Sequence, residues 1–237
     1  MKSHLFIGLL ALSAVLPARA AIYSLGNVNG SGASLNTAIP DGNPSGVSSS
    51  MTVSTPEFQI TDIQVTLNVS GGYNGDLYAY LSYNGTLVTL LNRVGVGTIN
   101  GGDAFGSADS GFNNVTLGST GSDVHWATAG GGALSGSYLA DGRQISPLSS
   151  PSSFNAAGTV TLAGSFGGMN PNGTWTLFFA DLSGGETSTL QGWSLNITAV
   201  PEPVNVALAV FGGVLGVWSI SRRRSKSAPV EQSSTLN

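Results

Sequence analysis

The chain has 237 residues, enough for one domain or two small ones; only 8% of them are charged, 34 are glycine and none is cysteine. So few charged residues leave little material for the exposed faces of amphipathic helices, and the lack of cysteine excludes disulfides, thiolate metal sites and a cysteine nucleophile. Between residues 21 and 200, ten acidic side chains stand against only Arg93 and Arg143, a formal charge of -8. Such a surface repels nucleic acid and attracts cations, so we expect no nucleic-acid partner.

The first twenty residues have the pattern of a secretory signal peptide. Lys2 supplies a positive charge, residues 5–16 form an uncharged and mostly apolar core, and Ala18 and Ala20 are the small residues that signal peptidase recognises. We predict a 1–20 signal peptide that is cleaved after Ala20. An uncleaved anchor helix is the alternative, but the proline and small residues before the cleavage point favour a processing site.

Alternation of apolar and polar residues predicts strands in the ectodomain, which we expect to span 21–199. The clear runs are 62–69, 77–83, 87–91, 174–179 and 193–198. Asn-Gly pairs bound the second run at both ends and adopt the backbone angles of tight hairpin turns, so the first three runs predict an antiparallel meander. Trp175 and Trp193 are in phase with apolar neighbours, which predicts that both rings anchor the core.

The remaining parts of the ectodomain are rich in glycine, serine and asparagine. Residues 21–55 predict edge strands and loops, and the long connections at 95–152 predict loops over a sandwich. No segment of the ectodomain favours a helix. The expected fold is all-β, a jelly-roll or related antiparallel β-sandwich, with one C-terminal transmembrane helix.

Several segments, in the same order, resemble the P domain that accompanies proprotein convertases. They are Ile60 to Leu67, Gly75-Asp76-Leu77, Thr89 to Gly95, Gly111 to Leu117, Leu148 to Phe154 and Asn172 to Ile197. The resemblance covers 55–199, and its most specific part is the Gly-x-Trp-x-Leu…Trp-x-Leu-x-Ile ending. It implies a jelly-roll β-sandwich. In the convertases this domain is an appendage to a separate catalytic domain, so the resemblance does not imply protease activity for this chain.

No set of residues predicts an active site. The ectodomain has one histidine, His125, and the chain has no Gly-x-Ser-x-Gly elbow, so a serine protease triad is not supported. We expect His125 to be a solvated loop residue. No aromatic-flanked pair of glutamates suggests glycoside hydrolysis, and no phosphate loop is present. We predict that the protein is not an enzyme.

Three carboxylates near predicted strand ends suggest a weakly bound calcium ion. Asp76 follows Gly75, Asp181 follows a strand, and Glu186 lies in the next loop. Calcium prefers oxygen ligands, which loop carboxylates and carbonyls supply. The alternative is that these are ordinary turn and strand-end acids bonded to nearby amides.

The stretch 204–220 predicts a transmembrane helix. It contains only Asn205 and Ser219 as polar residues and would be about 25 Å long as a helix. Arg222, Arg223, Arg224 and Lys226 follow at once, and by the positive-inside rule they predict that 225–237 is a cytoplasmic tail. A helix buried in a globular core is the alternative, but a basic cluster at once after it makes that arrangement unfavourable.

Pro201-Glu202-Pro203, the apolar stretch and Arg222-Arg223-Arg224 together resemble the PEP-CTERM sorting signal of Gram-negative bacteria, over 200–224. In that family a membrane transpeptidase, exosortase, processes proteins near the Pro-Glu-Pro. The resemblance implies an exosortase-like partner, an inner-membrane intermediate, and a final location at the cell surface or in the extracellular matrix. The thirteen-residue tail departs from the pattern, since such proteins usually end soon after the basic cluster.

These observations predict a non-enzymatic exported surface or matrix protein whose sandwich serves adhesion or structural support. Its expected partners are extracellular polysaccharide or surface proteins, besides the sorting enzyme and the membrane. Two alternatives stay open. The first is a carbohydrate-binding matrix module, and the second is a protease-associated accessory domain without its own catalytic triad.

Overall fold

The computed structural model describes residues 19–201 and 211–218, and the chain divides into two compact units, of which one spans Ala18–Val200. This unit is built almost entirely of strands, with a few single-turn helices between them. The elements are β1 (Arg19–Gly26), β2 (Thr37–Ile39), β3 (Asn43–Val53), β4 (Glu57–Gly71), η1 (Asn74–Asp76), β5 (Leu77–Tyr83), β6 (Thr86–Asn92), β7 (Phe112–Asp123), η2 (Val124–Trp126), β8 (Ser137–Leu139), η3 (Pro151–Asn155), α1 (Leu162–Phe166), β9 (Gly173–Asp181) and β10 (Ser188–Pro201).

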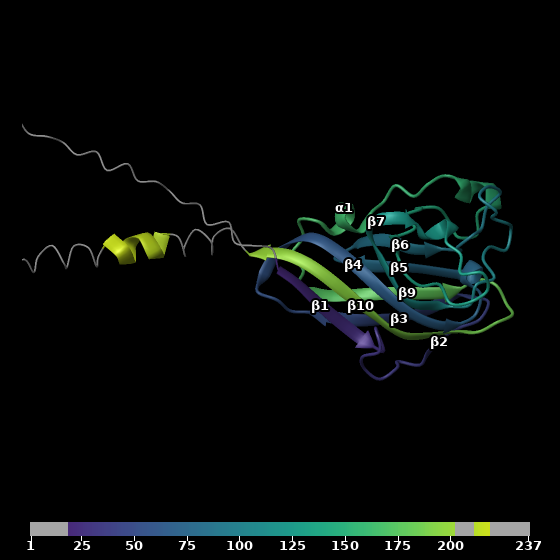
Figure 1. Ribbon diagram of the computed structural model, residues 1–237, viewed down its shortest axis with the longest axis horizontal. Helices are drawn as coiled ribbons and strands as arrows, with labels where there is room; N and C mark the ends of the chain where they lie inside the picture. The colour runs from purple at the N-terminus through teal and green to yellow at the C-terminus, as the bar shows by residue number, and fades with distance from the viewer. Residues whose placement is uncertain (1–18, 202–210, 219–237) are drawn as a thin grey trace, which may run out of the picture. The chain divides into compact units, whose positions relative to one another are not determined.

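The strands form two sheets (Figure 1). One has the order β1-β10-β4-β7-β8, with β2 also paired to β10, and the other has the order β3-β9-β5-β6. Strand β1 is therefore an edge strand that pairs with β10 alone. The described residues of this unit are mostly β, as the alternation of the sequence predicted.

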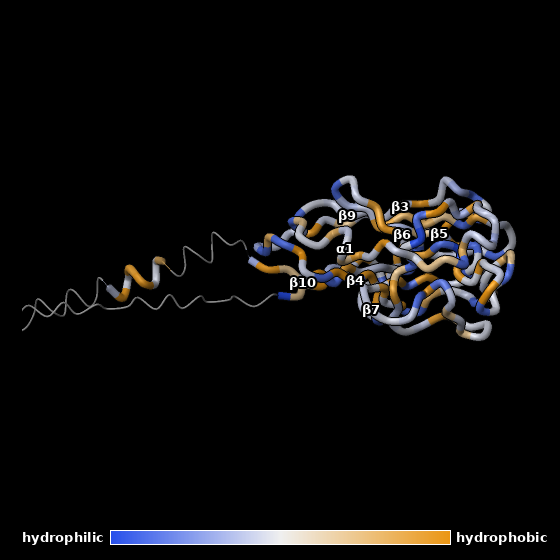
Figure 2. Tube along the Cα trace, turned by 90° about the horizontal axis from the view of Figure 1, so that it is seen from above, coloured by the Kyte–Doolittle hydropathy of each residue, from blue (hydrophilic) through white to orange (hydrophobic). Residues whose placement is uncertain are grey.

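One hydrophobic core lies between the two sheets. Alternate residues of β5 point into it, as the regular burial pattern of this strand shows, and hydrophobic residues lie along the strands (Figure 2). Trp175 and Trp193 are fully buried, which confirms their prediction as core anchors. The indole nitrogen of Trp193 on β10 donates to Ser49 Oγ on β3 at 2.9 Å, a bond that links one sheet to the other.

The five predicted strands are confirmed as parts of β4, β5, β6, β9 and β10. The hairpin between β5 and β6 is also confirmed. Asn84 and Gly85 have φ angles of 48° and 79°, and Tyr83 pairs with Thr86 directly before and after them. Positive φ at both central positions is what a two-residue hairpin turn of this kind requires.

The predicted meander is wrong at its first turn. β4 and β5 lie in different sheets, and Asn74-Gly75 belongs to the helical turn η1 rather than to a hairpin. The buried side chain of Asn74 accepts a hydrogen bond from Gly111 N at 2.9 Å and donates to Gly111 O at 3.1 Å. These bonds hold the chain where it crosses between the sheets, and β5 pairs with β9 instead of β4.

The region 21–55 contains edge strands, as predicted, whereas the region 95–152, which was expected to be loops, contains a long strand. β3 has eleven residues and pairs along β9, although its serines and threonine leave one face exposed and weaken the alternation. β7 has twelve residues and lies inside the larger sheet, between β4 and β8. Its register against β4 shifts between Leu67 and Val69, which interrupts the two-residue period. The short helix α1 was not predicted either.

Part of the predicted membrane-spanning stretch 204–220 is described: residues 211–218 are helical. Its other residues, most of the predicted signal peptide and the predicted cytoplasmic tail 225–237 lie outside the described residues. Among the residues that are described, no helix is long and apolar enough to cross a membrane.

Candidate functional site

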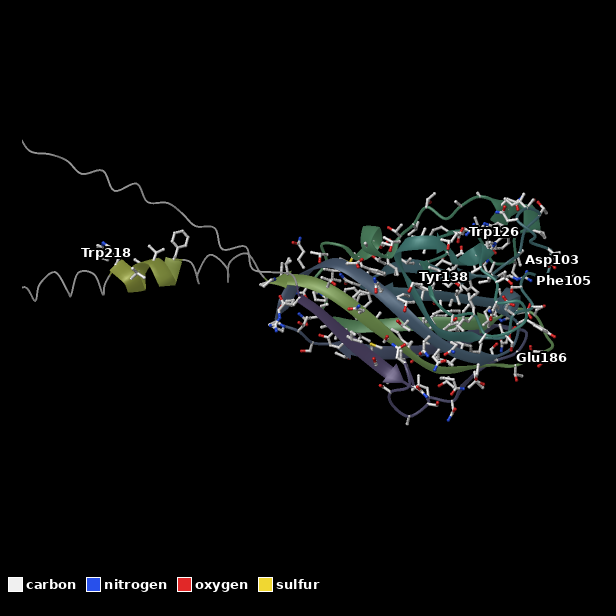
Figure 3. The ribbon with its side chains drawn as sticks, viewed as in Figure 1. Asp103, Phe105, Trp126, Tyr138, Glu186 and Trp218 are labelled. Carbon is white, nitrogen blue, oxygen red and sulfur yellow. The ribbon has the colours of Figure 1, made fainter. Side chains whose placement is uncertain are left out.

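The sandwich has two different ends. Arg19 pairs with Ala199, so β1 begins and β10 finishes at one end, which we call the terminal end. The opposite end, here called the loop end, is formed by the loops around 41–42, 72–76, 93–109, 124–131 and 182–187. Trp126, Asp103, Phe105 and Glu186 all lie toward the loop end (Figure 3).

Three aspartates gather at the loop end because the strand register brings their backbones together. Asp181 is the last residue of β9, and it is paired with the first residue of β3 on one side and the first residue of β5 on the other. Asp41 and Asp76 stand just before those two strand starts. The charges of all three act on one another. We call this group the aspartate cluster.

Burial raises the pKa of Asp76 to about 6, and the negative charge of Asp181 adds to this effect, while Arg93 partly opposes it. Burial also raises the pKa of Asp181 above its ordinary value; a hydrogen bond from the Ser183 amide opposes the rise, and the charge of Asp41 increases it. The Oδ2 atom of Asp181 is buried and has no hydrogen-bond partner. The cluster is therefore a place where folding brings like charges together in a partly dry environment.

The structure brings together two of the three residues predicted to bind calcium. Glu186 is exposed in the loop before β10, and Asp41, which the sequence did not single out, accompanies Asp76 and Asp181 instead. No group of three or more His, Cys, Asp and Glu side chains among residues 19–201 and 211–218 is arranged to hold a metal ion. Calcium binding stays a prediction from sequence.

The expectation of a solvated His125 is wrong. The side chain is fully buried, with Nδ1 2.8 Å from Asp141 Oδ2 and Nε2 2.8 Å from the carbonyl oxygen of Val96. The ring also lies parallel to that of Phe154, with 5.6 Å between centroids. The sequence pattern misled because η2 folds the Asp123–Trp126 segment back under the 93–97 loop, where Gly95 N donates to His125 O.

Arg143 joins His125 and two aspartates into one buried network. Its guanidinium donates to Asp141 Oδ1 at 3.2 Å and to both carboxylate oxygens of Asp123, and its Nε donates to Phe154 O at 3.0 Å. Both ring nitrogens of His125 thus face acceptor groups, a carboxylate oxygen at Nδ1 and a carbonyl oxygen at Nε2. A ring that donates from both nitrogens satisfies this pattern of hydrogen bonds.

This network does not resemble a catalytic arrangement. A general base needs a free ring nitrogen facing a nucleophile or a water molecule, whereas both nitrogens of His125 face protein acceptors inside the core. Asp141 and Arg143 were not predicted as a site. The one available signal was that Arg143 is one of only two basic residues in the ectodomain.

Next to the network, a pocket of about 420 Å³ opens at the loop end. Trp126 lines the pocket, and the buried network contacts its ring. The ring lies edge-on to that of His125, with 4.6 Å between centroids, and Arg143 Cζ is 5.8 Å from the Trp126 centroid. Close approach of Gly97 and Gly102 to the ring edge leaves no space for side chains there. The rest of the lining is glycine backbone with Asn100, Ser107, Ala108, Asp109, Ala127 and Thr128.

The lining of this pocket contains one acidic side chain, and the protein itself uses the hydrogen-bonding capacity of that side chain. Asp109 is its one ionisable side chain, and its carboxylate already accepts from the amides of Ala129 and Gly131. Burial opposes ionisation, but these amides with the hydroxyls of Ser107 and Thr128 lower the pKa of Asp109 overall. What remains for a ligand is an aromatic ring, hydroxyl and amide groups, and glycine backbone.

The predicted processing residues are described only in part. Ala20 is the second residue of β1 and is exposed, and Pro201 is the last residue of β10. Ala18, Glu202, Pro203, Arg222, Arg223 and Arg224 lie outside the described residues. The last described residue of β10 is thus the first proline of the predicted sorting motif.

No family model matches the chain, and no curated protein matches it. Among solved structures, it is similar to the complex of the Aeromonas sobria serine protease and the chaperone, at 16% identity and a TM-score of 0.43, covering 79% of this chain and 28% of that one. A second structure, the serine protease of Aeromonas sobria, matches at 16% identity and a TM-score of 0.41, covering 78% and 28%. This chain spans less than a third of the length of these proteins. Similarity of this size decides neither fold nor function.

We expect Asp76→Asn to raise the melting temperature at pH 7 by several degrees and to change it little at pH 4. The pKa of about 6 in the folded domain lies above the ordinary value of about 3.9, so protonation favours the folded state. That stabilisation is present at low pH and is lost as the pH rises from about 4 through 6. Removing the charge at pH 7 removes the repulsion.

Thermal melts across this pH range measure the effect, with Asp62→Asn on β4 as the control. An equal gain at pH 4 and pH 7 would contradict the explanation. The same melts with millimolar calcium or with chelator test the predicted ion, which would raise the wild-type midpoint but not that of Asp181→Asn. A wild-type midpoint that calcium leaves unchanged would rule the ion out.

Proposed function

We propose that this protein is a non-enzymatic, exported module of the cell surface or extracellular matrix. The observation that carries the proposal is the polarity of the sandwich. The chain continues toward the proposed sorting segment from the terminal end, while the Trp126 pocket and the longest loops lie at the loop end. A domain attached at one end and carrying its binding groups at the other suits display toward a partner.

The sorting mechanism in this proposal uses the C-terminal segment. Pro201 closes β10, so the Pro-Glu-Pro motif would follow the folded domain without a spacer. Proline restricts the backbone and supplies no amide donor, which favours an extended segment that a membrane transpeptidase of the exosortase type can process. The 204–220 stretch would hold the intermediate in the inner membrane of a Gram-negative-type bacterium before release to the surface or matrix.

For the ectodomain we propose a jelly-roll architecture like that of the P domain. Two sheets of mostly antiparallel strands around one core support this assignment. The enclosed state of His125 supports a role without catalysis, and this includes the alternative of a protease-associated accessory domain without its own triad.

The Trp126 pocket favours a second candidate function, carbohydrate binding in the matrix. Sugars present apolar C–H faces that pack on aromatic rings and hydroxyl groups that bond to neutral polar groups. The pocket offers both, because Trp126 is partly exposed and Asn100, Ser107 and Thr128 are uncharged. Its volume lies within the usual range of about 300–1,000 Å³ for small-molecule sites.

In a host with exosortase, we expect the surface-released protein to end near residue 200. Processing at the Pro-Glu-Pro motif would separate the ectodomain from the apolar stretch and the tail. Mass spectrometry of the released protein measures its C-terminus, and a host without exosortase is the control, in which the full chain should stay with the membrane. Peptides from 225–237 attached to the released form would contradict this mechanism.

On an array of neutral glycans, we expect the protein to bind a restricted set and Trp126→Ala to lose that binding at least about tenfold, the equivalent of about 1.4 kcal/mol. Phe58→Ala is the matched control, since Phe58 is an exposed aromatic residue at the start of β4, away from the pocket. If Trp126→Ala keeps the binding and its melting temperature is unchanged, carbohydrate binding by this pocket is contradicted, and structural support remains as the proposed role.

A further inference from the structure

Glu57, the first residue of β4, is a buried carboxylate that lacks a partner. The residue is 7% exposed. Its Oε2 atom is enclosed by protein and receives no hydrogen bond. A carboxylate in this position is unfavourable unless a cation or hydrogen-bond donor faces it. A positively charged group next to this carboxylate would therefore stabilise it.

A small pocket at the terminal end brings Glu57 together with the beginning of β1. The pocket has a volume of about 150 Å³, and Ala20, Ala21 and Tyr23 of β1 line it together with Glu57. Ala21 and Tyr23 are half-buried, whereas the residues before and between them are exposed. The Tyr23 hydroxyl donates to Ser54 O at 3.4 Å, which brings β1 against the turn that leads into Glu57.

No basic side chain of the ectodomain can serve this carboxylate. Residues 21–200 contain only two, and both are used at other places. Arg143 belongs to the buried network with Asp141, and Arg93 donates to Gly75 O at the loop end. Arg19, which also lines the pocket, belongs to the leader and would leave with it.

We propose that leader removal creates the missing cation. Signal peptidase hydrolyses the Ala20–Ala21 peptide bond; water supplies the hydroxyl of the new carboxyl group and the hydrogen of the new amine. That amine, with an ordinary pKa of about 7.7–8.0, takes up a further proton at neutral pH. The resulting α-ammonium group of Ala21 forms an ion pair with Glu57 inside the pocket.

This ion pair fixes the first residue of an edge strand. β1 pairs only with β10, and Ala21 lies opposite Ile197, close to the point where the chain leaves the sandwich. Maturation at the N-terminus therefore strengthens the sheet beside the C-terminal exit. The inference rests on the export in the proposed function and on the cleavage after Ala20 that the sequence predicts, and it adds a site for the new N-terminus.

The test uses the full chain exported from a Gram-negative host that lacks exosortase, with the N-terminus identified by mass spectrometry. Half of each sample is acetylated at mildly acidic pH, where the α-amine reacts ahead of Lys226, the other primary amine of the mature chain. Acetylation removes the charge without changing the fold or the sequence. Wild type, Glu57→Gln and the control Asp62→Asn are melted with and without acetylation.

We expect acetylation to lower the melting temperature of wild type and Asp62→Asn by several degrees, and that of Glu57→Gln by less than about 1 °C. Equal losses in wild type and Glu57→Gln, or no loss in wild type, would overturn the ion pair and leave export and sorting untouched. A mature chain that begins at a residue other than Ala21 would overturn both the ion pair and the proposed cleavage.

Discussion

The loop end of the sandwich depends on the buried ion pair between Arg143 and Asp141. One oxygen of Asp141 accepts from the guanidinium and the other from His125, so neither charge is left alone in the core. Removing one partner of such a pair typically costs about 3–5 kcal/mol, because the other remains buried and unpaired. Arg143 also donates to Phe154 O and His125 to Val96 O, which joins three loops that are distant in the sequence. The glycine-rich loop end thereby gains a fixed geometry.

In three groups of buried carboxylates in this domain, stability depends on whether a cation lies next to the carboxylate. Asp141 has Arg143 and His125 as partners, and these two side chains lie against the ring of Trp126. Burial raises the pKa values of Asp76 and Asp181, and the negative charge of a neighbouring aspartate adds to each rise. Glu57 has no partner before maturation, and we propose that the new N-terminus supplies one. With only two basic side chains between residues 21 and 200, the placement of each cation decides which part of the domain is rigid.

Sequence reasoning predicted the strands whose inner and outer faces differ clearly, such as β5, β9 and β10, and it predicted the two core tryptophans. It failed where a side chain contacts residues that are far away in the sequence. Asn74 looked like a hairpin residue, but its bonds to Gly111 turn the chain into the other sheet. His125 looked like a loop residue because its neighbours are polar, whereas its burial depends on Asp141 and Arg143, sixteen and eighteen positions further along the chain. Asp41 likewise lies near Asp181 because of the strand order, which the local alternation of apolar and polar residues does not predict.

Nitrogen NMR of the His125 ring tests most directly whether the network is structural rather than catalytic. His125 is the only histidine between residues 21 and 200, so its ring signals can be assigned without ambiguity. We expect both ring nitrogens to be protonated and the Nδ1 proton to be protected from exchange with solvent. In Asp141→Asn this proton should lose its protection. One unprotonated ring nitrogen that titrates and exchanges like that of an exposed histidine would contradict a ring that donates from both nitrogens, and with it the rigid support proposed for the Trp126 pocket.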